Sequence, residues 1–138
     1  MRKVVLVDRD GTLIEEPESG RVLAVEQVRL MPGVIPALLR IQGAGFELAI
    51  VSNQPGLGTD ACPSETFERV ETHVRALFES QGVRFAGAFF CPHYTEDGCG
   101  CQKPAVGLVR DYLAAPPVDR ARSFVGGDRD SDVELAHN

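Results

Sequence analysis

Two aspartates separated by a single residue follow an apolar run close to the start of the chain. In the segment KVVLVDRDGT, Asp8 and Asp10 come directly after residues 4–7, which are all valine or leucine. Neighbouring carboxylates repel each other and lose hydration when buried, so this pair needs a proton or a cation to offset its repulsion. Side chains two apart in an extended segment point the same way, and we therefore expect Asp8 and Asp10 to face one crevice while Arg9 faces elsewhere.

The same letters also have a purely structural interpretation. An Asp-Gly pair between hydrophobic runs is typical of a hairpin turn, and Asp10 with Gly11 taken alone favours that turn. A second acidic segment, GDRDSD, changes the balance because it contains Asp128 and Asp132 near the end of the chain. A third carboxylate beside the first two would form an oxygen-rich site of the kind that Mg²⁺ prefers.

Three further residues could bind a phosphate group. Lys103 is one of only two lysines in the chain, and a compact ammonium suits a phosphate oxygen in a small pocket. Ser52 and Asn53 end an apolar run and offer a hydroxyl and an amide as donors. Taken singly, a solvated surface lysine and the start of a loop explain these residues as well.

Together these residues indicate phosphoryl transfer through an aspartyl-phosphate. Asp8 would attack phosphorus, while Asp10 would protonate the leaving alcohol and then accept a proton from the attacking water. The net charge of -6 argues against a broad basic face for nucleic acid. A metal and local donors such as Lys103 would therefore have to hold the anionic substrate.

A separate group of soft and borderline ligands lies in the segment CPHYTEDGCGCQKP. Cys91, His93, Cys99 and Cys101 have the spacing C-x-H-x5-C-x-C, and four such ligands suit tetrahedral Zn²⁺. In a chain without an export signal, this clustering favours a metal over disulfides, with reduced free cysteines as the alternative. Because the protein fills all four positions, the zinc would be structural and would brace the loop that carries Lys103.

Apolar runs that alternate with helical patterns predict an α/β fold with a mostly parallel sheet and crossover helices. The expected strands cover residues 4–7, 46–54, 85–91 and 123–127, and the expected helices lie within residues 31–46, 63–82, 106–113 and 130–137. The carboxyl ends of parallel strands share one edge of the sheet, where ligands bind. Each expected strand ends in polar residues, so the pattern predicts a site at that edge.

The bulk composition indicates one domain over residues 1–138. Hydrophobic residues make up 43% and charged residues 25% of the chain, and the longest apolar runs have the length of strands. We therefore expect no membrane-spanning segment and, because charges come early in MRKVVLVDRD, no signal peptide, which together predict a cytoplasmic protein. The chain ends in LAHN without a strand after the last expected helix, an ending consistent with C-terminal truncation.

As a set, these motifs resemble those of the haloacid dehalogenase superfamily of phosphatases. DRDGT resembles its first motif, SNQ its second, Lys103-Pro104 its third and GDRDSD its fourth, so the resemblance spans nearly the whole chain. It implies a Rossmann-like three-layer fold, and we expect no large cap domain because neither residues 14–32 nor residues 53–63 leave room for one. The zinc-binding loop narrows the resemblance to the subgroup that contains histidinol-phosphate phosphatase and the heptose-bisphosphate phosphatases.

The resemblance also implies a role for each matching residue, with Asp8 as the nucleophile and Asp10 as the acid/base. The implied Mg²⁺ ligands are Asp8, the backbone carbonyl of Asp10, and Asp128. The implied phosphate ligands are Ser52, Asn53 and Lys103. Asp132 would orient Lys103 or a metal-bound water.

Within the subgroup, the motif NQPGLGT and the short Cys/His loop favour histidinol phosphate, an intermediate of histidine biosynthesis, as the substrate. This substrate is cationic at its amine, so Glu16 or Glu18 could recognise it, although such an acidic run is equally typical of a solvated loop. Gln102 stands where relatives usually have arginine, which removes a charge near the substrate. The alternatives are a D-glycero-D-manno-heptose 1,7-bisphosphate 7-phosphatase and a non-catalytic, zinc-stabilised phosphate-binding module. The expected partner is a small phosphorylated metabolite, with neither nucleic acid nor membrane, for a monomer or homodimer.

Overall fold

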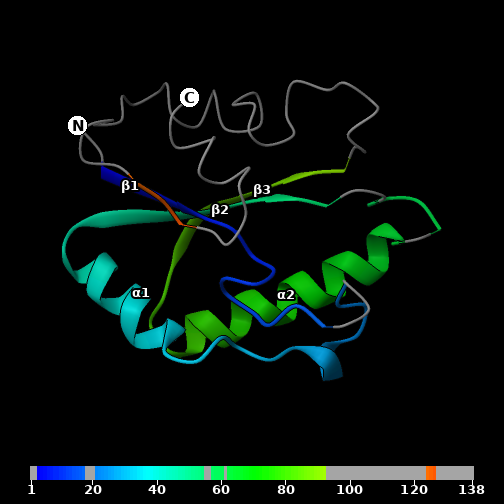
Figure 1. Ribbon diagram of the computed structural model, residues 1–138, viewed down its shortest axis with the longest axis horizontal. Helices are drawn as coiled ribbons and strands as arrows, with labels where there is room; N and C mark the ends of the chain where they lie inside the picture. The colour runs from blue at the N-terminus through cyan, green and yellow to red at the C-terminus, as the bar shows by residue number, and fades with distance from the viewer. Residues whose placement is uncertain (1–2, 18–20, 55–56, 61, 93–123, 127–138) are drawn as a thin grey trace.

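A four-stranded sheet organises the part of the chain that the computed structural model describes, namely residues 3–17, 21–54, 57–60, 62–92 and 124–126. Along the chain the elements are β1 (Lys3–Val7), the 3₁₀ helix η1 (Val25–Gln27), α1 (Val34–Gly43), β2 (Phe46–Asn53), α2 (Ser64–Ser80), β3 (Phe85–Cys91) and β4 (Phe124–Gly126). The strands lie in the order β3-β2-β1-β4, and every neighbouring pair is parallel (Figure 1). The predicted α/β fold with a parallel sheet is confirmed, while the helices predicted within residues 106–113 and 130–137 lie outside the described residues.

β1 and β2 form the apolar centre of the sheet. Val5 pairs with Leu48 and Val7 with Ile50, and these four side chains belong to one buried core cluster. Successive side chains of a strand point to opposite faces, so Val4, which is also fully buried, covers the other face. Burial on both faces explains why β1 reads as an unbroken apolar run, because parallel sheets in α/β proteins are covered on both sides.

The two helices α1 and α2 lie on one face of the sheet (Figure 1). The buried apolar stripe of α2 consists of Phe67, Val70, Val74 and Phe78. A spacing of three or four residues places such side chains on one side of a helix, facing the strands. The ring of Phe78 meets the ring of Phe85 in β3 edge to face, with the centroids 5.5 Å apart. None of the helices in the described residues is long and apolar enough to span a bilayer.

The segment between β1 and α1 folds back along the turn that follows β1. The backbone N–H of Glu15 donates to the carbonyl of Arg29 at 2.7 Å, and the N–H of Met31 donates to the carbonyl of Leu13 at 3.1 Å. Val22 of this segment is buried in the main core cluster. The segment therefore packs against the same hydrophobic core as the sheet and fixes the path of the chain where it leaves β1.

The order of the strands reverses direction at β1. The chain passes from β1 to β2 to β3 on one side, whereas β4 pairs with β1 on the other side. In open parallel sheets, ligands bind at the carboxyl ends of the strands beside such a reversal. Asp8 directly follows β1 at this point, and Ser52, Asn53 and Cys91 close the two strands beyond it. The predicted clustering of polar strand ends on one edge is thus found for the described strands, while Asp128 lies outside the described residues.

Candidate active site

A compact turn begins as soon as the chain leaves β1. The carbonyl oxygen of Arg9 accepts the backbone N–H of Leu13 at 2.9 Å and that of Ile14 at 3.2 Å. Gly11 has φ 83, a left-handed conformation that glycine adopts without strain. The Asp-Gly pair therefore does form a turn, as one interpretation predicted, but no hairpin follows because the neighbours of β1 are the parallel strands β2 and β4.

Arg9 does not face away from the aspartates, and that prediction was wrong. Its side chain is fully buried, and its Nε donates to Oδ1 of Asp10 at 3.0 Å. The turn is the physical reason: the alternation of side chains holds only for extended backbone, and here the backbone leaves the strand after Val7. Asp8 is itself buried, and its Oδ1 accepts the backbone N–H of Arg9 at 2.9 Å.

A buried acid and two aromatic rings surround the guanidinium of Arg9. Its Nη1 donates to Oε1 of Glu71 in α2 at 3.2 Å. The guanidinium carbon lies 4.7 Å from the centroid of the Phe67 ring and 5.9 Å from that of Phe90, within the range of a cation–π interaction. Burial raises the pKa of Glu71 above its ordinary value, and the nearby charge of Arg9 opposes that rise. Arg9 thus links the turn after β1 to the first half of α2.

Gln54 connects the ends of three strands. Its side-chain Nε2 donates to Oδ2 of Asp10 and to Oγ of Ser52, each at 3.0 Å, and its backbone N–H donates to the carbonyl of Cys91 at 2.7 Å. Gln54 and Ser52 are each only 2% exposed, so water does not compete strongly for these hydrogen bonds. The structure therefore brings Asp10 and Ser52 together through a residue to which the sequence patterns had assigned no role.

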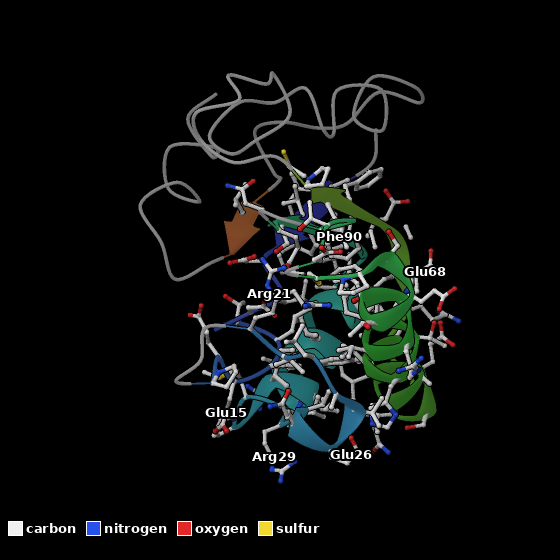
Figure 2. The ribbon with its side chains drawn as sticks, turned by 90° about the vertical axis from the view of Figure 1, so that its right-hand side faces the viewer. Glu15, Arg21, Glu26, Arg29, Glu68 and Phe90 are labelled. Carbon is white, nitrogen blue, oxygen red and sulfur yellow. The ribbon has the colours of Figure 1, made fainter. Side chains whose placement is uncertain are left out.

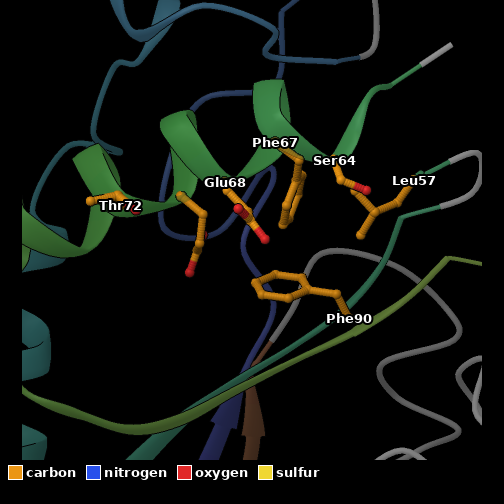
Figure 3. Close-up of a pocket in the computed structure, with 7 residues that line it drawn as sticks. Leu57, Ser64, Phe67, Glu68, Thr72 and Phe90 are labelled. Carbon is orange, nitrogen blue, oxygen red and sulfur yellow. The ribbon is translucent and has the colours of Figure 1, made fainter. Parts of the chain in front are cut away.

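A cavity of about 450 Å³ opens beside this network, between α2 and β3 (Figure 3). Its lining residues are Leu57, Ser64, Phe67, Glu68, Glu71, Thr72 and Phe90. The rings of Phe67 and Phe90 meet edge to face with centroids 4.8 Å apart. Arg9 lies against both rings and donates to Asp10, so its guanidinium contacts the aromatic lining of the cavity as well as Asp10.

Comparisons with known proteins extend this description. No protein-family model matches the chain. The chain is 47% identical over 138 residues to the "Histidine biosynthesis bifunctional protein HisB" of Legionella pneumophila (strain Lens), a match that covers 100% of this chain and 39% of the relative. It is 41% identical over 138 residues to the protein of the same name from Campylobacter jejuni subsp. jejuni serotype O:23/36 (strain 81-176), covering 99% and 39% respectively. The chain thus spans 39% of the length of these curated relatives.

Solved structures decide the fold. The crystal structure of D,D-heptose 1,7-bisphosphate phosphatase from B. bronchiseptica, complexed with magnesium and phosphate, superposes with a TM-score of 0.86 at 27% identity, covering 98% of this chain and 75% of that chain. A had-like phosphatase from Mesorhizobium loti matches with a TM-score of 0.83 at 24% identity over 98% of this chain and 67% of that chain. The chain has the haloacid dehalogenase fold. The resemblance inferred from the four motifs is confirmed.

Several of the predicted site residues of this haloacid dehalogenase fold lie outside the described residues. They are Glu18, His93, Cys99, Cys101, Gln102, Lys103, Asp128 and Asp132. Among the predicted residues that the structure describes, Cys91 is buried at the end of β3 and Glu16 is exposed. Glu15, next to Glu16, lies well apart from Phe90 in Figure 2, and neither of these two described glutamates lines the cavity beside α2.

Asp8 and Asp10, which the structure describes, carry oxygen atoms of the kind that could bind a hard cation. Within the described residues, no group of three or more His, Cys, Asp or Glu side chains could hold a metal ion. Both carboxylate oxygens of Asp10 accept hydrogen bonds, from Arg9 and from Gln54. This arrangement fits the implied Mg²⁺ set, in which Asp10 would contribute its backbone carbonyl and Asp8 its carboxylate, both of them oxygens that Mg²⁺ prefers.

Proposed function

We propose that the chain is a Mg²⁺-dependent phosphomonoester hydrolase that acts through an aspartyl-phosphate on histidinol phosphate, in histidine biosynthesis. The observation that carries the proposal is the position of Asp8 and Asp10 at the carboxyl end of β1, beside the reversal of strand order, with both oxygens of Asp10 held by donors. The names of the curated relatives support the pathway. A cytoplasmic location follows as part of the same proposal.

In the proposed reaction, a carboxylate oxygen of Asp8 attacks phosphorus and the bond from phosphorus to the alcohol oxygen breaks. Asp10 gives a proton to the departing alcohol oxygen, so that a neutral alcohol leaves. Water then attacks the phosphorus of the aspartyl-phosphate, Asp10 takes up the proton of that water, and inorganic phosphate and the free Asp8 carboxylate result. Ser52, Asn53 and Lys103 would hold the phosphate oxygens throughout.

Asp8, the carbonyl of Asp10 and Asp128 would hold Mg²⁺, which when bound supplies positive charge against the phosphate oxygens. Asp132 would support this end of the site by orienting Lys103. The magnesium bound in the crystal structure of the heptose phosphatase supports the choice of metal. A net charge of -6 makes such local positive charge necessary for an anionic substrate.

We further propose a structural zinc bound by Cys91, His93, Cys99 and Cys101. The support from the structure is that Cys91 is buried at the end of β3 and that its carbonyl accepts the N–H of Gln54, so the loop starts beside the site. Metal analysis of the purified chain should find about one Zn²⁺ per molecule by the four-ligand argument. Cys99→Ser should lose the zinc and Cys62→Ala should retain it. Full retention in Cys99→Ser would contradict this ligand set.

Two observations point to different substrates. The relatives named for histidine biosynthesis are 41–47% identical, whereas the heptose 1,7-bisphosphate phosphatase is 27% identical, and the higher identity favours histidinol phosphate. Glu16, Glu18 and Gln102 are the proposed substrate-selecting residues. Unchanged saturation constants for histidinol phosphate in both Glu16→Gln and Glu18→Gln would remove the two glutamates from this role.

A panel of phosphate esters assayed with Mg²⁺ tests the proposed function. The panel contains histidinol phosphate, D-glycero-D-manno-heptose 1,7-bisphosphate and simple alkyl phosphates. We expect the highest kcat/KM with histidinol phosphate. A preference for the heptose bisphosphate would select the alternative enzyme, and no release of phosphate from any ester would favour the non-catalytic phosphate-binding module.

A further inference from the structure

The two carboxylate oxygens of Asp10 face donors of different chemical character. Oδ1 accepts from Nε of Arg9 at 3.0 Å, and Oδ2 accepts from Nε2 of Gln54 at 3.0 Å. Arginine keeps its protons in proteins, so Oδ1 faces a permanent N–H donor. The charged N–H of Arg9 stabilises negative charge on Oδ1 more strongly than the neutral amide N–H of Gln54 stabilises it on Oδ2. Proton transfer to and from Asp10 therefore takes place at Oδ2, on the lone pair that Gln54 leaves free.

The orientation of the Gln54 amide follows from its partners. An ionised carboxylate only accepts hydrogen bonds, so the amide must present its nitrogen to Asp10 rather than its oxygen. The same nitrogen lies 3.0 Å from Oγ of Ser52, which uses the second amide hydrogen. The backbone N–H of Gln54 is fixed on the carbonyl of Cys91 at 2.7 Å, and the residue is only 2% exposed, so it is anchored at both ends.

This arrangement also determines what the Ser52 hydroxyl can do. A hydroxyl has one hydrogen to donate, and because Ser52 Oγ accepts from Gln54 that hydrogen remains available for another acceptor. The contact from Ser52 Oγ to the carbonyl of Asn53 is 3.5 Å, at the outer limit of a hydrogen bond. A phosphate oxygen is a stronger acceptor than a carbonyl at that distance.

We propose that Gln54 is a positioning residue that couples proton transfer by Asp10 to phosphate binding by Ser52. One amide nitrogen holds the oxygen that exchanges the proton and sets the direction of the hydroxyl that meets the phosphate. When Asp10 gives its proton to the departing alcohol oxygen, the Gln54 N–H stabilises the charge left on Oδ2. The inference rests on the proposed function and adds to it a residue that acts through Asp10 and Ser52.

The test compares two phosphate esters in single-turnover experiments. An alkyl ester needs its leaving oxygen protonated, whereas p-nitrophenyl phosphate releases a stable anion and needs little help from an acid. In Gln54→Met, which removes both donors at similar length, we expect phosphoryl transfer from the alkyl ester to fall by about 100-fold and that from p-nitrophenyl phosphate by less than about 10-fold. Gln81→Met, an exposed glutamine at the end of α2, serves as the matched control and should leave both rates unchanged.

Gln54→Leu keeps the backbone hydrogen bond and removes both donors without adding a charge beside Asp10, so it decides the question if Gln54→Met does not fold. The same divergence between the two esters is expected in this variant. Equal losses with both esters, or no loss with either, in the variant that folds would overturn the positioning role. A wild-type chain that is inactive toward both esters would instead contradict the proposed function, and with it the inference.

Discussion

Arg9 and Glu71 form a buried ion pair, with Nη1 and Oε1 3.2 Å apart, although the two residues are 62 positions apart in the sequence. The pair fastens the turn that carries Asp10 to the helix α2. Only one oxygen of Glu71 and two nitrogens of Arg9 are used: within the described residues, Oε2 and Nη2 are buried without a hydrogen-bond partner. Removal of only one partner of such a pair strongly destabilises the folded state, because the remaining charge stays buried.

Removal of the cation should therefore destabilise the fold. We expect Arg9→Met to lower the free energy of unfolding by about 3–5 kcal/mol, because Glu71 is left buried without its counter-ion. The double variant Arg9→Met/Glu71→Leu should recover part of this loss, since an apolar pair can replace a buried ion pair. Urea unfolding of the wild type, both single variants and the double variant measures the coupling. A loss below about 0.5 kcal/mol in Arg9→Met would contradict this account.

Glu71 should also make stability depend on pH. Burial raises its pKa above 4.5 in the folded state, with Arg9 and Arg75 opposing the rise, so the folded chain binds this proton more tightly than the unfolded chain. The stabilisation from Glu71 is then complete below pH 4.5 and is lost as the pH rises through the raised pKa. Glu71→Gln should show a smaller fall in the free energy of unfolding over that window. Glu68→Gln, an exposed change on the same helix, is the control and should follow the wild type.

The proposed nucleophile has a direct test. In the wild type, the backbone nitrogen of Arg9 lies 2.9 Å from Oδ1 of Asp8. Asp8→Asn retains an oxygen that can accept this N–H, so the fold should persist. We expect release of phosphate to fall by at least about 1,000-fold, because an amide cannot form the aspartyl-phosphate. Phosphate release and thermal unfolding are measured side by side, with Asp60→Asn, an exposed aspartate, as the control. Equal activity of Asp8→Asn and the wild type would contradict the proposed aspartyl-phosphate mechanism.

The core under α2 offers a prediction that is independent of function. Phe78 is fully buried against Phe85, and Phe78→Ala should lower the free energy of unfolding by about 3–5 kcal/mol through lost contacts and the cavity left behind. Leu39 is 38% exposed on α1, so Leu39→Ala should cost less than about 1 kcal/mol. Equilibrium unfolding in denaturant compares the two. Similar losses for both variants would show that the packing of α2 on β3 has been misjudged.

Sequence patterns predicted the sheet well because its strands are apolar runs of the right length. The expected strands over residues 46–54 and 85–91 match β2 (Phe46–Asn53) and β3 (Phe85–Cys91). Local patterns say less where the backbone turns. The direction of the Arg9 side chain was predicted from the alternation of side chains along a strand, and this alternation no longer holds once the chain leaves β1.

The role of Gln54 was missed for a different reason. Its partner Asp10 is 44 positions away, and only the pairing of β1 with β2 brings the two side chains to the same edge. The motif SNQ contains the residue, and a glutamine at the end of a buried strand was the available signal. The partners of its two amide hydrogens are determined by the tertiary structure, which a single sequence does not show.

The position of β4 in the sheet bears on how the protein is made. β1 pairs with β2 along one edge and with residues 124–126 along the other. On the ribosome, the strand that precedes Asp8 therefore has an open edge until residue 126 has left the exit tunnel, long after β2 and β3 have been synthesised. A nascent chain exposes this edge to other unfinished chains, because an unpaired apolar strand is a template for misassembly.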